Sequence, residues 1–200
     1  MKSEIGRRKD TEIIRRVLAG DTDSFAGMIE RYEDHVFRIV FRHVPPDEAA
    51  EVAHDVFVEA FRSLANYTPD APFSNWLARI SIRRCHDYWR MFHHRKEIPI
   101  SQIGDDQQRR LQQGGALATD GGRRAGFDER FDQRELLDHV LNRLGPDDRM
   151  VLVLVHLEER SIEETAQLLG WTRSKVKVRA HRARKHLRGQ LEALVIRKEL

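Results

Sequence analysis

The stretch that decides the fold is residues 161–188, SIEETAQLLGWTRSKVKVRAHRARKHLR. Ser161 is suited to cap a helix N-terminus, and Glu164 is placed to complete a capping box with it. Gly170 directly follows the apolar positions, where a helix end favours a residue free to adopt positive φ. Thr172 can then cap a second helix. The stretch therefore predicts a helix, a tight turn and a second helix.

The second predicted helix has an apolar back and a cationic front. Between Arg173 and Arg188 there are eight Lys/Arg and no Asp/Glu. One stripe at helical spacing is apolar: Val176, Ala180, Ala183 and Leu187. The opposite face carries Ser174, Lys177, Val178, His181, Lys185 and Arg188. A solvated surface helix would explain the charge alone, but the capped helix and glycine turn before it match a helix-turn-helix, which fits a DNA major groove.

Charge is distributed unevenly along the chain. The chain has 200 residues, enough for one large domain or two small ones, and its net charge is only +3. Residues 45–60 hold five acids and no Lys/Arg, whereas residues 76–96 hold six Lys/Arg and one acid. The two basic segments suit a polyanion, and the acidic segment suits a protein partner.

Several classes of protein are disfavoured by the composition. Cys85 is the single cysteine, so no internal disulfide can form. Residues 1–10 are polar, and the longest apolar run, residues 150–157, is too short to span a bilayer. The sequence shows no phosphate-cradling glycine motif and no Ser/His/Asp set, so we expect no enzyme and no cofactor. We expect a soluble, cytoplasmic protein.

Four helices are expected before a glycine-rich stretch, at residues 11–19, 25–44, 47–66 and 73–94. The outer face of the third is acidic: Asp47, Glu48, Glu51, Asp55 and Glu59. The fourth interleaves arginines with Tyr88, Trp89 and Phe92. Such a pattern can track phosphates while aromatic rings stack on unpaired bases, or the rings can simply close a helical core. Core packing is favoured for Trp76, and both alternatives stay open for Tyr88 and Trp89.

Residues 101–130 divide the chain. They hold six of the twelve glycines and almost no apolar periodicity, which predicts a flexible linker. We therefore predict an all-α fold of two small helical domains, residues 1–98 and 131–200, joined by a linker at 99–130. In the second domain, residues 131–144 predict a helix. Residues 147–157 alternate Val and Leu and could form a strand by propensity alone, but no second strand is available, so we expect a buried helix.

The order of these features resembles the extracytoplasmic-function (ECF) sigma factors of bacterial RNA polymerase. The segment at 49–64 is similar to the family's polymerase-clamp helix and reads AAEVAHDVFVEAFRSL. The segment at 73–90 is similar to its promoter-melting helix and reads FSNWLARISIRRCHDYWR. The segment 161–188 is similar to its terminal helix-turn-helix. The resemblance implies a sigma-2-like and a sigma-4-like domain, binding to the clamp and flap of core polymerase, and recognition and opening of promoter DNA. It also implies control by an anti-sigma factor and no insertion into membranes.

The resemblance also implies site residues. Contacts to the −35 element are expected from Arg173, Ser174, Lys175, Lys177, Val178, Arg179, His181, Arg182 and Lys185. Contacts to the −10 element, including flipped-out bases, are expected from Asn66, Tyr67, Asn75, Arg79, Arg83, Arg84, Asp87, Tyr88, Trp89 and Arg90. Contacts to polymerase are expected from Asp47, Glu48, Glu51, His54, Asp55, Phe57 and Glu59.

The chain departs from the family pattern at three of these positions. Arg83 stands where the family usually has Asn, and His54 stands where the clamp helix usually has Gln. Lys175 replaces a Thr of the recognition helix and adds a charge near the groove. The −10 contact at Arg83 and the −35 sequence preference are therefore not expected to be typical of the family.

Two other interpretations remain at the level of sequence. Cys85, His86, His93 and His94 lie close together and suit zinc by residue type, although their spacing lacks the paired pattern of known zinc sites. A promoter-specific repressor or activator could use the same helix-turn-helix without polymerase. That class would bind a duplex operator tightly by itself, whereas a sigma factor would require core polymerase.

Overall fold

The computed structural model describes residues 2–97, 137 and 140–198. Within them every regular element is helical, as the sequence predicts. The predicted linker at 99–130 and most of the predicted helix at 131–144 lie outside the described residues, although Leu137, Val140 and Leu141 are helical. No helix in the described part has the length and apolar character that crossing a membrane requires.

The N-terminal half consists of four α-helices. Helix α1 spans Lys2–Leu18, α2 Ala26–His43, α3 Pro46–Arg62 and α4 Phe73–Glu97. Short 3-10 turns at Thr22–Phe25 and Leu64–Asn66 connect them. Pro46 occupies the first turn of α3, where its missing N–H costs nothing and Asp47 and Glu48 favour the positive end of the helix dipole.

The C-terminal half consists of α7 (Pro146–Leu152), a π-helical segment (Val153–Leu157), α8 (Ile162–Leu169) and α9 (Arg173–Lys198). The run at 147–157 is helical and its residues 148–154 are buried, which confirms the helix over the strand. Its second half widens to π-helix, a detail that the Val/Leu pattern does not reveal. Helix α9 continues past residue 188 to Lys198.

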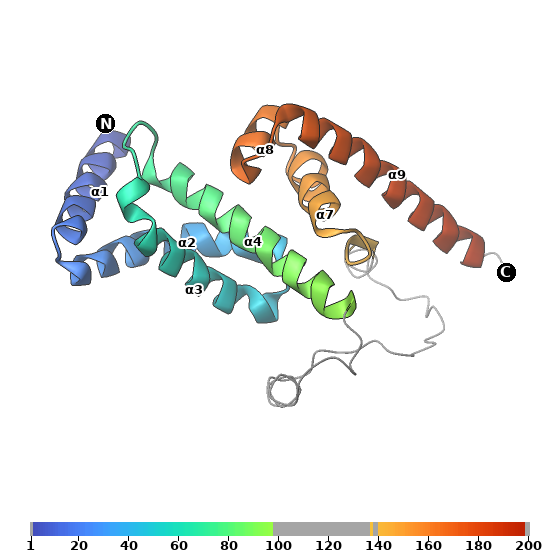
Figure 1. Ribbon diagram of the computed structural model, residues 1–200, viewed down its shortest axis with the longest axis horizontal. Coiled ribbons are helices and arrows are strands. Elements are labelled where there is room, and N and C mark those ends of the chain that lie inside the picture. The colour runs from blue at the N-terminus through green and yellow to red at the C-terminus, as the bar shows by residue number, and fades with distance from the viewer. Residues whose placement is uncertain (1, 98–136, 138–139, 199–200) are drawn as a thin grey trace, which may run out of the picture.

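Helix α4 lies at the centre of the molecule, with α2 and α3 on one side and α7 and α8 on the other (Figure 1). Buried side chains of the two halves form one continuous apolar cluster, to which the C-terminal half contributes Met150, Val151, Leu154, Ala166, Leu169, Val176 and Ala180. A smaller cluster around Leu141, Leu152 and Ala183 supports α9. The two halves are therefore packed together in this conformation and share this cluster.

Candidate nucleic-acid interface

The turn between α8 and α9 has the geometry that the sequence predicts. Ser161 Oγ accepts the Glu164 N–H at 3.1 Å, and the Glu164 carboxylate accepts the Ser161 N–H at 2.9 Å, so the capping box is complete. These hydrogen bonds lower the pKa of the Glu164 carboxyl. Gly170 has φ +68°, and Thr172 Oγ1 accepts the Lys175 N–H at 3.2 Å. The helix-turn-helix is thus defined by local caps.

Helix α9 buries its apolar stripe and exposes its cationic face. Val176, Ala180 and Ala183 are buried, and Leu187 packs against the smaller cluster. The expected −35 residues are exposed, except Arg179, which is half-buried. Among the described residues no ion pair engages Lys177, Arg182 or Lys185. These three cations are therefore available to phosphates.

Two acidic residues of α7 form ion pairs with the cations of α9 that lie nearest to α7. Asp147 lies 3.1 Å from Arg179 and 3.6 Å from the Lys175 ammonium, and Asp148 accepts from Arg179 at 3.1 Å. The Lys175 ammonium also lies 3.5 Å from the Trp171 ring centroid. Lys175 and Arg179 are thus partly neutralised within the chain, so they position the helix as much as they offer charge.

The expected −10 residues divide into exposed and covered groups. Asn66, Asn75, Arg79, Arg83 and Arg90 are exposed on α4 and the loop before it. Arg84 instead pairs with Glu59 of α3 at 2.6 Å. The Tyr67 hydroxyl donates to the Ala71 carbonyl at 2.8 Å, and its ring packs against Phe73 and Trp76. Trp76 is partly buried against the core, in agreement with the interpretation favoured for it.

Trp89 is a core residue in this conformation. It is 1% exposed, and its indole N–H donates to the His43 carbonyl at 2.7 Å. Tyr88 is half-buried, and its ring contacts Trp89 and Phe92. Burial and the nearby Glu48 carboxylate raise the pKa of Tyr88 to about 12. Of the two alternatives that the sequence left open for Trp89, the structure has the ring packed in the core in this conformation.

The expected polymerase-binding face of α3 is mostly exposed. Asp47, Glu51, His54 and Asp55 are exposed, whereas Glu48 and Glu59 are half-buried. Phe57 is buried in the core of the N-terminal half, unlike the exposed members of the expected polymerase-binding set. The reason is register: Phe57 follows Ala53 by one helical turn and shares its inward side.

The Cys/His group offers little for metal binding. Burial raises the pKa of the Cys85 thiol to about 12, which disfavours the thiolate that a metal needs. His86 Nε2 lies 2.9 Å from Asp147 in the other half of the molecule. Within the part of the chain that the structure describes, no three His, Cys, Asp or Glu side chains gather as a metal site.

Contacts between the halves were not predicted from the sequence. His43 lies 3.1 Å from Glu158, His86 bonds Asp147, and Arg149 packs over Trp89. All are distant in sequence, so periodicity could not reveal them. One signal was present: Asp147-Asp148 directly follows Gly145-Pro146, where a helix begins and acids are favoured.

Comparison with known proteins places the chain in a family. Residues 28–94 match the model "Sigma-70 region 2", and residues 134–187 match "Sigma-70, region 4". The chain is 26% identical over 189 residues to the ECF RNA polymerase sigma-E factor of Escherichia coli (strain K12), covering 94% of this chain and 97% of that protein. It is 27% identical over 182 residues to ECF RNA polymerase sigma factor SigW of Bacillus subtilis (strain 168), covering 90% and 96%.

Two solved structures share the fold. One is CnrH in complex with the cytosolic domain of CnrY, with TM-score 0.50, 22% identity and coverage of 90% of this chain and 96% of the other. The other is sigma factor RpoE with the anti-sigma factor NepR from Bartonella quintana, with TM-score 0.51, 16% identity and coverage of 84% and 96%. With both sigma-70 regions matched in order along nearly the whole length of its relatives, this chain belongs to the sigma-70 family and is an ECF sigma factor.

Proposed function

We propose that the three helical surfaces of this sigma factor divide the work of initiation. The acidic face of α3 binds the polymerase clamp, α4 and the loop before it engage the −10 element, and α9 reads the −35 element. As a regulatory subunit it supplies recognition, and the polymerase supplies the chemistry. The domain limits that go with this division are residues 1–98 and 131–200.

The observation that carries the proposal is the exposed, unpaired charge of α9 behind a capped turn. Lys177, Arg182 and Lys185 stand on the solvent side of a helix whose opposite side is buried. Phosphate contacts from such cations set affinity and salt dependence, while a few neighbours such as Ser174 and Val178 contact base edges. This is the arrangement in which a recognition helix enters the major groove.

The acidic face of α3 suits a basic surface on a protein partner. Asp47, Glu51 and Asp55 are spaced at about one helical turn and are exposed together. Charge complementarity of this kind raises association rates and sets orientation. The anti-sigma factor that we propose as a regulator would compete for this surface or for the DNA-binding surfaces, as NepR forms a complex with sigma factor RpoE.

Transcription in vitro tests the function directly. Core polymerase, this protein and the promoter of its own operon are expected to yield a specific transcript that neither protein yields alone. Charge reversal at Glu51 and Asp55 is expected to abolish that transcript by weakening the binding of polymerase. Reversal at Glu12, an exposed acid on α1, serves as the control. Absence of any transcript from candidate promoters would contradict the proposal.

A further inference from the structure

The arginines of α4 that were expected at the −10 element differ in how their charge is compensated. Arg79 and Arg83 are exposed, and neither forms an ion pair with a carboxylate in the described part of the chain. Arg84 is half-buried, and its guanidinium lies 2.6 Å from the carboxylate of Glu59 on α3. Open and compensated cations therefore lie within about two turns of the same helix.

Glu59 begins a chain of alternating charges that leads onto the exposed face of α4. Arg84 Nη2 donates to Glu59 Oε2 at 2.6 Å, whereas Arg84 Nη1 lies 3.7 Å from Asp87. The same Asp87 lies 3.9 Å from Arg90 Nη1. Only the first of these contacts is within hydrogen-bond distance, so Glu59 is the principal partner of Arg84.

The pair of Glu59 and Arg84 is also better protected from solvent than the contact of Asp87 with Arg90. The side chains of Arg84 and Glu59 are 33% and 36% exposed, whereas that of Arg90 is 66% exposed. Salt screens partly buried pairs less than exposed ones, and a charge-assisted hydrogen bond of this length is among the stronger kinds. A DNA phosphate would therefore have to displace a carboxylate to reach Arg84.

Glu59 differs from the acids of α3 that we propose for the polymerase clamp. Asp47, Glu51 and Asp55 are exposed, and no ion pair engages any of them among the residues that the structure describes. Such acids are available to a basic partner at no internal cost. Glu59 is half-buried and would first have to release Arg84.

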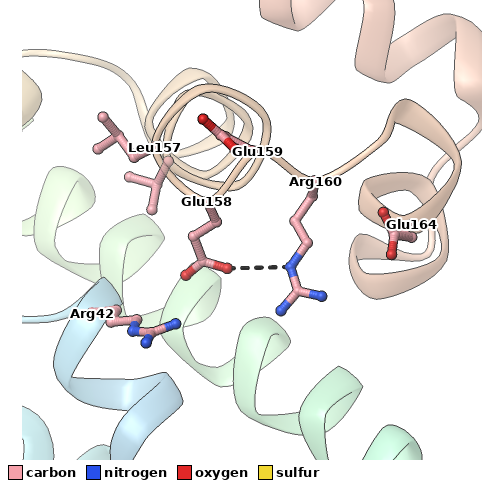
Figure 2. A pocket seen from close by; sticks show the side chains of 7 residues that line it. Arg42, Leu157, Glu158, Glu159, Arg160 and Glu164 are labelled. Atoms are coloured by element: carbon pink, nitrogen blue, oxygen red, sulfur yellow. Dashed lines mark hydrogen bonds and ion pairs between the residues drawn. The ribbon is translucent and has the colours of Figure 1, made fainter.

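Glu158 provides a comparison, because it too is a half-buried carboxylate with basic partners. It lies 3.1 Å from His43 and 3.5 Å from Arg160, and Figure 2 shows the contact with Arg160. Neither partner belongs to α4 or to the residues expected at the −10 element. Loss of the Glu158 carboxylate would therefore uncover no cation on α4, whereas loss of the Glu59 carboxylate would uncover Arg84.

We propose that Glu59 restrains the DNA affinity of α4 by neutralising Arg84, and that Glu59 does not contact polymerase. Arg84 stays away from phosphates, and the unpaired Arg79 and Arg83 supply the phosphate contacts of α4. Glu59 thereby keeps the sequence-independent part of the affinity low, so that contacts with bases decide where the holoenzyme binds. This inference rests on the function proposed above for α4.

Binding of the holoenzyme to fluorescein-labelled fork DNA over a series of salt concentrations tests the restraint. One probe carries the unpaired non-template −10 strand from the promoter of the protein's own operon, and a second carries the same bases in scrambled order. Glu59→Gln is expected to tighten binding to both probes about fivefold near 0.1 M salt. The slope of the logarithm of the binding constant against the logarithm of salt concentration should steepen by about 0.7, the value for one further phosphate of a single strand.

Three further variants assign the effect to the pair. Arg84→Ala in the Glu59→Gln background is expected to remove the gain, whereas Arg84→Ala alone should leave the salt dependence nearly unchanged. Glu158→Gln makes the same chemical change away from α4 and is the matched control, with unchanged binding expected. If Glu59→Gln does not fold, as judged by circular dichroism, Glu59→Ala removes the same carboxylate and favours the helix.

The outcomes separate this inference from the proposed function. Unchanged or weaker DNA binding by a folded Glu59 variant would overturn the inference, and so would a gain that persists without Arg84. Affinity for core polymerase should stay at the wild-type value in Glu59→Gln and fall in Glu51→Lys. A fall in Glu59→Gln would also overturn the inference, because Glu59 would then be a polymerase contact. Absence of a transcript from the wild-type holoenzyme would instead contradict the proposed function.

Discussion

Helices α4 and α9 are both long and basic, yet the fold uses their cations differently. On α4, Arg84 is paired with Glu59, and the aromatic side chains between the arginines face the core or the C-terminal half. On α9, Lys177, Arg182 and Lys185 face solvent, whereas Arg173 meets Glu163 of α8 and Lys175 and Arg179 meet acids of α7. Similar composition therefore gives one surface that is partly closed and one that is open.

The difference follows from what lies opposite each helix. Helix α4 is central and is contacted on two sides, so a residue on it is exposed only where neither half covers it. Helix α9 is peripheral and rests on α7 and α8 by one narrow apolar stripe.

Trp89→Ala is expected to cause the largest loss of stability. It removes a fully buried ring, the hydrogen bond from that ring to His43 and the surface on which the Arg149 guanidinium packs. The free energy of unfolding should fall by about 3–5 kcal/mol. Val178→Ala on the exposed side of α9 should change that free energy by no more than about 0.5 kcal/mol. Urea titration followed by circular dichroism measures both. Equal effects would mean that the two helices are not packed as described.

Gly170→Ala is expected to destabilise the turn that leads into α9. The residue is left-handed with φ +68°, a conformation that costs Ala about 1–2 kcal/mol, and the new Cβ would also press on Arg83. Gly170→Asn is the informative comparison, because Asn tolerates this backbone better than Ala does. Thermal unfolding of the three proteins should rank them Gly, Asn, Ala. An Ala variant as stable as the wild type would contradict the turn geometry.

Lys177→Ala is expected to weaken binding of the holoenzyme to −35 duplex DNA. The steepness with which the logarithm of the binding constant falls with the logarithm of salt concentration should decrease by about one. Arg84→Ala, which removes a cation of α4 already paired with Glu59, should lower that steepness much less. Binding measured over a series of salt concentrations separates the two variants. A larger salt effect at Arg84 would reverse the assignment of open and compensated charge.

Glu158 is expected to make the free energy of unfolding depend on pH in the acid range. This effect is expected to be smaller than those of the substitutions above. Burial raises the pKa of Glu158, but hydrogen bonding and attraction from His43 and Arg160 outweigh it and hold the pKa below its usual range. Because the folded pKa is the lower one, the stabilisation is present above the unfolded value and is lost as pH falls through the folded value. Glu158→Gln should flatten that acid decline in denaturation measured at successive pH values. An unchanged decline would show that Glu158 does not contribute.

Local features were predictable because their causes are local. The capping box at Ser161, the positive φ at Gly170 and the cap at Thr172 each depend on residues within a few positions. The buried stripe of α9 follows from its 3.6-residue period, and the helix at 147–157 follows from the lack of a partner strand. The burial of Phe57 follows in the same way from its position one helical turn after the buried Ala53.

The sequence by itself thus determined the helices, their caps, the helix-turn-helix and the basic face of α9, since each is encoded by spacing along one segment. Only the tertiary structure decided that Arg84 meets Glu59, that Arg149 covers Trp89, and that His43 and His86 meet Glu158 and Asp147. The physical reason is separation along the chain: these partners are 25 to 115 residues apart. Such contacts form only when packing of the apolar cluster brings the two halves together, and no local period records them.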